Sequence, residues 1–217
     1  MLIVTVTLPE LHLRPSDGHK IRGYFANWWG EKSNLLHNHE ADGKPIYRYP
    51  LVQYKVLRNE PTILGLGEGA KLLVEMFLNL EELVIEDQIF PLANKNIRSK
   101  QVEVGLTKEA HVYQFLSPWM ALNPENYHAW KDAEGEERKR IEEGTLKRNI
   151  LAFLKAVGVW LEEELVVDLK LVPMSTKFKG QVMTAFKGSF STNVLLPDLI
   201  GLGKSTSRGY GIIQKVS

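Results

Sequence analysis

Residues 201–211 read Gly-Leu-Gly-Lys-Ser-Thr-Ser-Arg-Gly-Tyr-Gly, so that two Gly-x-Gly pairs flank two cations and three hydroxyls. Glycine lets a backbone approach a ligand closely, and successive exposed N–H groups form a concavity that binds anions. Lys204 and Arg208 would add positive charge, and the hydroxyl of Ser205 could hydrogen-bond a phosphate oxygen. The stretch predicts either a phosphate-binding loop or a glycine-rich hairpin without a ligand, and its chemistry alone does not decide between them.

The familiar nucleotide-binding loops do not fit this stretch. A Walker loop needs Gly-x4-Gly-Lys-Ser/Thr, but residue 198, five before Gly203, is Asp. The dinucleotide fingerprint Gly-x-Gly-x-x-Gly fails at Thr206. Ile212 and Ile213 follow and are strand-like, so the loop leads into a terminal strand.

Two segments upstream of the loop carry a resemblance. Residues 186–190 read Phe-Lys-Gly-Ser-Phe, and residues 195–200 read Leu-Leu-Pro-Asp-Leu-Ile. With the loop, they resemble the C-terminal signature of the CRISPR-associated repeat-processing endoribonucleases, the Cas-six family. The mark of that family, Gly-h-Gly-x5-Gly-h-Gly with h apolar, is matched over residues 201–211. The resemblance favours the phosphate-binding interpretation.

Bulk composition limits the class of protein. The chain has 217 residues, 44% of them apolar, which is enough for one large or two small domains. Cysteine is absent, so we expect no disulfide framework and no thiolate site, as suits a reducing cytoplasm. The apolar start is too short and too β-branched for a signal peptide. No apolar run approaches the ~20 residues of a membrane helix, and we expect a cytoplasmic protein without a membrane partner.

Charge is unevenly distributed along the chain. The net charge is only +1, but residues 61–168 carry 12 Lys and Arg against 19 Asp and Glu, and residues 169–217 carry seven against one. A basic tail is a plausible footprint for a polyanion, although it could equally neutralise the acidic middle. The RNA-binding residues that we predict are Gly201, Gly203, Lys204, Ser205, Arg208, Gly209 and Gly211 in the loop, with Lys177, Lys179 and Lys187 in the tail.

The first half of the chain predicts the order strand, helix, strand, strand, helix, strand. Strands are expected at 2–8, 47–57 (interrupted by Pro50), 61–66 and 84–90. Helices are expected from Ser16 or Asp17 through Trp28 and over 68–80, with a long polar loop at 30–45. This order is typical of a ferredoxin-like domain, and the turn-forming residues 91–96 predict its end.

The second half predicts a degenerate copy of that pattern. Strands are expected at 100–106, 111–116, 165–172, 180–192 and 211–216, with a helix starting at Asn123-Pro124 and another over 136–161 that Gly144 either breaks or joins. The last helix is replaced by residues 195–200 and the loop. The predicted fold is α+β, with two tandem ferredoxin-like (RRM-like) domains at 1–92 and 97–217, the second degenerate and carrying the C-terminal glycine-rich loop. The resemblance implies the same architecture.

Two histidines supply candidate acid–base chemistry. His37 and His39 lie two apart, so in an extended segment they point to one face. Histidine titrates near neutrality and can act as base or acid. Cleavage of RNA by its own 2′-OH needs a base for that hydroxyl and an acid for the leaving 5′-oxygen. It leaves a 2′,3′-cyclic phosphate and a 5′-OH and requires no metal or cofactor. Tyr47 could orient or donate, and Lys32 could stabilise the phosphorane charge.

The resemblance implies the same residues. Residues 37–39 and 47–55 read His-Asn-His and Tyr-Arg-Tyr-Pro-Leu-Val-Gln-Tyr-Lys, which is similar to the archaeal-type subgroup with paired histidines. It therefore implies cleavage of CRISPR repeat RNA by His37, His39, Tyr47 and Lys32. Repeat RNA is the implied partner, and a CRISPR effector complex or a second copy of the chain are further candidates. A non-catalytic RNA-binding subunit of the same fold is the alternative function.

Other sites have weaker support. Two loop histidines are most often surface residues or helix caps, and a zinc site lacks cysteine and a third ligand at metal-like spacing. A generic phosphate-loop enzyme lacks nearby carboxylates for magnesium. The remaining histidines are interpreted as structural or surface residues, and most tryptophans as core. These histidines are His12, His19, His111 and His128.

Overall fold

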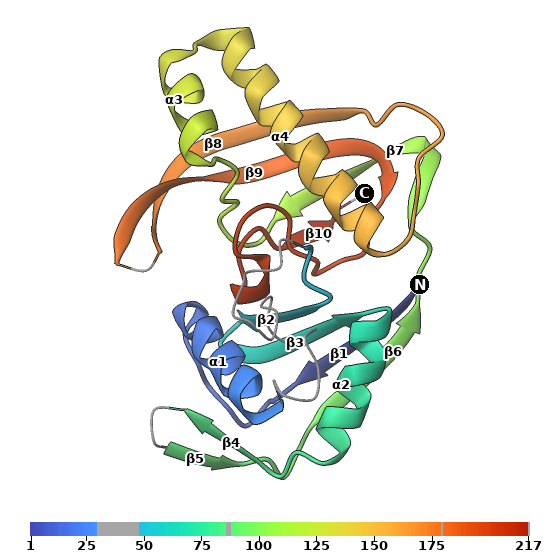
Figure 1. Ribbon diagram of the computed structural model, residues 1–217, viewed down its shortest axis with the longest axis vertical. Coiled ribbons are helices and arrows are strands. Elements are labelled where there is room, and N and C mark those ends of the chain that lie inside the picture. Colours follow the sequence, from blue (N-terminus) through green and yellow to red (C-terminus); the bar gives the residue numbers. More distant parts are fainter. Residues whose placement is uncertain (30–47, 86–87, 179, 217) are drawn as a thin grey trace, which may run out of the picture. The chain divides into compact units, whose positions relative to one another are not determined.

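The fold is described by a computed structural model of the chain. It covers residues 1–29, 48–85, 88–178 and 180–216 (Figure 1). The chain forms two compact units. The first comprises Met1–Val102 together with the short segment Ser207–Gly209, and the second comprises Glu103–Thr206 with Tyr210–Ser217.

The first unit contains a four-stranded antiparallel sheet. Its strands are β1 (Leu2–Thr7), β2 (Val52–Leu57), β3 (Glu60–Leu66) and β6 (Asn96–Gln101), in the order β2-β3-β1-β6. The register pairs Ile3 with Leu66 on β3 and with Lys100 on β6. The strands expected at 2–8 and 61–66 are confirmed. Of the strand expected over 47–57, the described residues 48–57 form a strand only from Val52, after Pro50, which has no N–H for a ladder.

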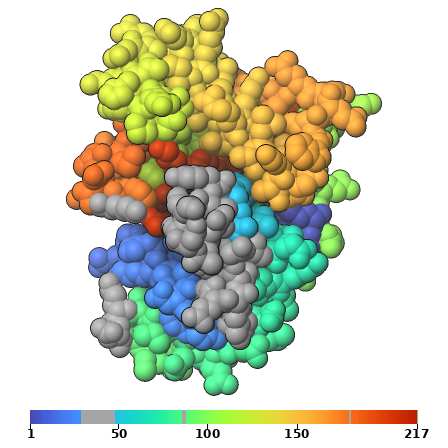
Figure 2. All heavy atoms as spheres, in the orientation of Figure 1, coloured from blue at the N-terminus to red at the C-terminus, as the bar shows by residue number. Residues whose placement is uncertain are grey.

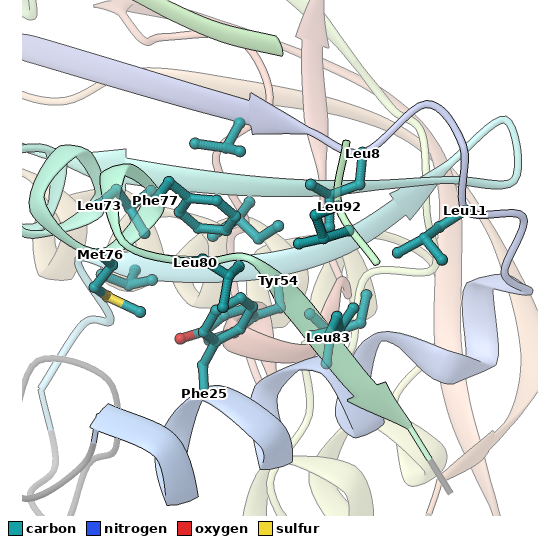
Figure 3. Close-up of a cluster of buried hydrophobic side chains, with 14 of the residues drawn as sticks. Leu8, Leu11, Phe25, Tyr54, Leu73, Met76, Phe77, Leu80, Leu83 and Leu92 are labelled. Carbon is teal, nitrogen blue, oxygen red and sulfur yellow. The ribbon is translucent and has the colours of Figure 1, made fainter. Parts of the chain in front are cut away.

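Two helices cover one face of this sheet. α1 (Gly18–Trp29) follows a single 3-10 turn, η1 (Pro15–Asp17), and α2 (Glu68–Leu78) follows β3. Phe25 of α1 and Phe77 of α2 are buried with Tyr54 of β2 in one apolar cluster (Figure 3). Both helices were expected, because their apolar residues recur at helical spacing.

The end of the first unit differs from the expectation. The predicted strand 84–90 is two short strands, β4 (Glu82–Ile85) and β5 (Gln88–Pro91), which pair with each other in a separate sheet. The fourth place in the main sheet belongs to β6, which pairs along its whole length with β1. The first unit therefore extends to Val102, beyond the turn-forming residues 91–96 where we expected it to end.

The second unit contains another antiparallel sheet, of order β10-β7-β9-β8. Its strands are β7 (Gly105–Phe115), β8 (Val167–Phe178), β9 (Gln181–Leu195) and β10 (Ile213–Lys215). The boundaries of the two strands expected at 100–106 and 111–116 are thus wrong. The first range ends β6 and begins β7, and β7 runs on to Phe115 with an irregularity between Leu106 and His111.

Two consecutive helices link β7 to β8. α3 (Pro124–Asp132) begins as predicted, because the Asn123 side chain accepts a 2.7 Å hydrogen bond from the Asn126 N–H and Pro124 opens the first turn. α4 (Gly135–Ala156) runs through Gly144 without a break. Figure 2 shows the side chains of α3 and α4 (yellow) on the surface of this unit.

Aromatic side chains fill the core of the second unit. Trp119 is fully buried, stacks on Phe115 at 5.3 Å between ring centroids and contacts Phe186 at 5.7 Å. Its indole N–H donates to Asn149 Oδ1 of α4 at 3.1 Å. Trp119 thereby ties the helix layer to the sheet, and it is also the residue on which the glycine-rich loop rests.

The two units share one strand order. Numbered along the chain within each sheet, the strands stand in the order fourth, first, third, second in both. In the first unit, α2 precedes the fourth strand, apart from the inserted β4–β5 pair. In the second unit, residues 196–212, with the 3-10 turn η2 (Thr206–Arg208), occupy that place. The expected replacement of the last helix by the loop is confirmed.

None of the helices in the described part of the chain has both the length and the apolar character needed to span a bilayer.

Candidate functional site

The glycine-rich loop is closed by its own backbone. The Leu202 N–H donates to the Gly211 carbonyl at 2.9 Å, and the Lys204 N–H donates to the Met120 carbonyl at 3.0 Å. The Gly211 N–H donates to the Pro118 carbonyl at 2.9 Å. These three N–H groups are engaged within the second unit. They are therefore not the donors of an anion-binding concavity.

Close packing explains three of the four glycines. A β-carbon on Gly203 would lie 2.8 Å from Trp119 Nε1, and one on Gly211 would lie 1.9 Å from the Leu202 carbonyl oxygen. On Gly201 it would meet the Thr206 side chain at 2.7 Å. Distances this short are not tolerated without movement of the backbone. Gly201, Gly203 and Gly211 thus fold the loop onto itself, and these contacts by themselves require glycine at the three positions.

The apolar residue of each Gly-x-Gly pair anchors the loop. Leu202 is fully buried. Tyr210 makes an edge-on ring contact with Phe178 at 5.8 Å and donates its hydroxyl to the Lys177 carbonyl at 2.9 Å, so it fixes the loop to the end of β8. The anchored pairs leave residues 204–208 as the tip.

The tip carries the charges and hydroxyls that the sequence points to. Lys204 is half-buried, and burial lowers the pKa of its amine. Ser205 adopts φ 58°, an unusual conformation for a residue with a side chain, and Thr206 is buried. η2 then carries Arg208.

The segment Ser207–Gly209 packs within the first unit. A β-carbon on Gly18, at the start of α1, would lie 3.2 Å from the Arg208 carbonyl oxygen. One on Gly209 would lie 3.5 Å from the Tyr54 carbonyl oxygen and 3.6 Å from the Lys55 Cα. The segment therefore crosses the first turn of α1 and the middle of β2.

Lys55 is a titratable group buried in β2. Its side chain is 0% exposed, and its ammonium group donates to Gln53 Oε1 at 2.7 Å. The Gln53 amide donates in turn to the Tyr49 hydroxyl at 2.8 Å and to the Pro50 carbonyl at 3.1 Å. Burial lowers the pKa of Lys55 to about 7. An amine that titrates near neutrality can exchange protons, which an ordinary lysine cannot do.

Only one feature of the sequence points to Lys55. A lysine within a strand is usually interpreted as solvent-facing. The signal was the spacing of Gln53 and Lys55, two apart and on the face opposite Tyr54, which places two polar side chains on one sheet face.

The predicted basic residues of the β8–β9 pair do not form one patch. Lys177 pairs with Val182, and Lys187 pairs with Val172. Residues 172 and 177 differ by an odd number along a continuous register, so the two exposed lysines lie on opposite faces of the sheet. A single RNA segment lying on one face would meet only one of them.

Two of the four remaining histidines contact neighbouring residues through hydrogen bonds, and the other two, His12 and His128, are exposed. His111 is buried and lies 2.9 Å, through Nε2, from the Thr107 hydroxyl. His19 Nδ1 donates to the Ser16 carbonyl at 2.6 Å. Across the described ranges the structure has no cluster of three His, Cys, Asp or Glu that could hold a metal ion. Of the tryptophans, Trp119 and Trp130 are core, whereas Trp160 is 74% exposed.

Profiles of one protein family cover both halves of the chain. The Cas6b N-terminal domain profile matches residues 1–103, and the Cas6b C-terminal domain profile matches residues 105–216. The chain belongs to the Cas6b family. The resemblance drawn from the loop is thereby confirmed at the level of the family, and its paired-histidine subgroup stays a prediction.

Solved structures are similar to this Cas6b family member over its full length. A crystal structure of a Cas6b protein matches it with a TM-score of 0.92 at 33% identity and covers 99% of both chains. The structure of a CRISPR RNA processing endoribonuclease Cas6b matches with a TM-score of 0.79 at 30% identity and covers 100% of both. The uncharacterized protein MJ0978 of Methanocaldococcus jannaschii is 32% identical over 143 residues, which are 65% of this chain and 97% of that protein.

Five predicted residues of this Cas6b family member lie outside the described ranges. They are His37, His39, Tyr47 and Lys32, in the range 30–47, and Lys179, which follows β8 in the sequence. Their roles stay predictions.

Proposed function

We propose that this Cas6b family member is a metal-independent endoribonuclease that cuts CRISPR repeat RNA into guide RNAs. One observation carries the proposal: a relative that is 30% identical over the full length is a CRISPR RNA processing endoribonuclease. The match of both halves to the Cas6b profiles supports it. The shared strand order of the two sheets supports the interpretation of the units as tandem ferredoxin-like domains, the second degenerate.

The proposed chemistry is an internal transesterification. The 2′-OH loses its proton to a base and attacks the adjacent phosphorus, and the bond to the 5′-oxygen breaks as an acid protonates that oxygen. The products are a 2′,3′-cyclic phosphate and a 5′-OH. We assign the base and acid to His37 and His39, with Tyr47 and Lys32 orienting and stabilising the phosphorane charge.

The proposed RNA-binding surface includes the loop tip, with Lys204, Ser205 and Arg208. Gly201, Gly203 and Gly211 contribute by shaping the loop, as their contacts indicate, and Gly209 by lying close to β2. Lys177 and Lys187 lie on opposite faces of the sheet, so a single RNA segment would contact only one of them. We further propose that the protein retains its product in a CRISPR effector complex. Pairing with a second copy of the chain and a cytoplasmic location are also part of the proposal.

The test is a cleavage assay on end-labelled repeat RNA in EDTA. We compare wild type with His37→Ala/His39→Ala and with a matched control, His12→Ala/His128→Ala, which removes two exposed histidines from other elements. A substrate with a single 2′-deoxy nucleotide at the cut site tests the nucleophile. We expect one cut per repeat by wild type and control, and none by the paired variant or on the deoxy substrate.

Three outcomes contradict the proposal. Cleavage that needs added metal, or that survives loss of both histidines, removes the 2′-OH and histidine mechanism. Tight binding of repeat RNA by a folded wild type that never cuts it supports the alternative function, a non-catalytic CRISPR RNA-binding subunit of the same fold.

A further inference from the structure

Two arginines from distant parts of the sequence meet at the start of α1. Arg22 follows Gly18 by four residues, so both lie on one side of the helix. The Arg208 carbonyl oxygen lies 3.2 Å from where a Gly18 β-carbon would be. Because Ser207–Gly209 packs within the first unit, this meeting is a feature of that unit alone.

The arginine pair, Arg22 and Arg208, places like charges together. Arg22 is half-buried, and burial, followed by the positive charge of Arg208, lowers the pKa of its guanidinium group. Among the described residues, the other group acting on it is the Tyr54 phenol. The carboxylate nearest in sequence, Asp17, is engaged elsewhere: it accepts from the Arg14 N–H at 3.0 Å and lies 2.9 Å from the Lys20 ammonium.

One atom of this pair and one atom of a neighbouring side chain are buried without a hydrogen-bond partner among the described residues. In the described part of the chain, Arg22 Nε and the Tyr54 hydroxyl are the buried side-chain atoms without a hydrogen bond. Tyr54 is fully buried on β2, and its ring stacks on Phe25 of α1 at 5.6 Å (Figure 3). A buried donor without an acceptor costs stability. An anion that accepts from Arg22 Nε and the Tyr54 hydroxyl would relieve this cost.

We propose that Arg22, Arg208 and the Tyr54 hydroxyl form a binding site for one phosphodiester group of the RNA backbone. Guanidinium groups present planar arrays of N–H donors that match phosphate oxygens, and the phenol supplies a further O–H donor. The identity of the ligand as RNA rests on the proposed function, whereas the affinity of the site for a phosphate oxyanion does not.

A binding role of Arg22 and a structural role of Arg22 predict opposite changes in the stability of the free protein. An arginine kept for structure makes the free protein less stable when it is replaced. Arg22 lacks an acceptor for Nε and has a cationic neighbour. Replacing Arg22 should therefore raise the melting temperature of the free protein and weaken its binding of phosphate.

The experiment uses Arg22→Gln, Arg208→Gln and the double variant, with Arg140→Gln as a matched control on the exposed face of α4. The first arm records melting temperatures in chloride and in inorganic phosphate at equal ionic strength. The second arm measures the dissociation constant of repeat RNA with a 2′-deoxy nucleotide at the cut site, at several salt concentrations.

We expect phosphate to raise the melting temperature of wild type and Arg140→Gln but not of the other variants. Each single substitution in the pair should weaken RNA binding roughly tenfold and reduce the salt dependence by about one phosphate contact. The double variant should be little worse than either single variant, because both arginines hold one phosphate.

Several results would overturn the site. They are an equal phosphate effect in all variants, a lower melting temperature for free Arg22→Gln, or wild-type RNA binding by Arg22→Gln. If phosphate stabilises the protein through the arginine pair while wild type neither binds nor cuts repeat RNA, the site stands as a phosphate site and the proposed function fails instead.

Discussion

Lys55 shows how a strand residue can acquire unusual chemistry from its surroundings alone. Within the described ranges its ammonium group has one partner, the neutral Gln53 Oε1, and the shift of its pKa to about 7 arises from burial. Above about pH 7 the folded chain therefore favours the neutral amine, whereas the unfolded chain keeps the ordinary pKa of 10.5.

The pH dependence of stability follows from this difference. Between pH 7 and 10.5, the unfolded chain binds a proton that the folded chain does not, so stability rises with pH across that window. We expect Lys55→Met to be more stable than wild type at pH 6, by on the order of 3 kcal/mol, with the advantage shrinking as pH approaches 10. Urea unfolding at pH 6, 8 and 9.5 measures it.

The control is Lys71→Met, which removes an exposed lysine of α2. The difference in free energy of unfolding between Lys71→Met and wild type should stay constant between pH 6 and 9.5, unlike the difference for Lys55→Met. Parallel pH profiles for wild type and Lys55→Met would show that Lys55 stays charged in the folded protein, and the burial argument would be wrong.

At the scale of elements, the loop depends on how it is anchored to β8. The Tyr210 hydroxyl donates to the Lys177 carbonyl at 2.9 Å. Tyr24 provides a matched bond, since its hydroxyl donates to the Glu82 carbonyl at 3.0 Å at the start of β4. Both bonds are exposed side-chain-to-backbone contacts. They differ in what they connect: the first joins the glycine-rich loop to β8, and the second joins α1 to β4.

We expect Tyr210→Phe and Tyr24→Phe to lose similar amounts of stability, about 1 kcal/mol or less each. Only Tyr210→Phe should weaken repeat RNA binding, by roughly threefold, because it loosens the loop that carries Lys204 and Arg208. Thermal unfolding and fluorescence anisotropy measure the two effects. Equal RNA affinities in the two variants would mean that anchorage of the loop does not matter for binding.

The elements that the sequence predicts well are those with periodic apolar residues. α1, α2 and β1 bury alternating or helically spaced side chains, and each was expected. β6 was missed because it is an edge strand whose six residues are all exposed, so it shows no apolar alternation. Its pairing with β1 is a tertiary contact that no local pattern reveals.

The site was only partly predictable for a related reason. The spacing of the loop glycines points to phosphate binding, but three of them are required by contacts with Trp119, Thr206 and Leu202, and Trp119 is distant from Gly203 in the sequence. The meeting of Arg22 with Arg208 spans most of the chain. Sequence spacing cannot express such contacts, and the fold of the first unit is needed to see them.

At the scale of the whole molecule, the distribution of charge matters more than its sum. A net charge of +1 gives little general attraction for a polyanion, but residues 169–217 carry seven Lys and Arg against one Asp. Binding through local basic groups releases counterions from the phosphates that they contact, and the affinity then falls steeply with salt.

We expect the affinity for uncleavable repeat RNA to fall about 100-fold between 50 and 200 mM salt, as for a protein that neutralises about five phosphates of a single strand. Substituting Lys204 and Arg208 together with alanine should weaken binding and flatten this slope, because both side chains belong to the basic tail. Substituting Lys131 and Arg140 on α3 and α4, within the acidic segment 61–168, should leave both affinity and slope unchanged. A shallow slope in wild type, or an equal effect of the two double substitutions, would mean that RNA binding does not depend on the basic tail.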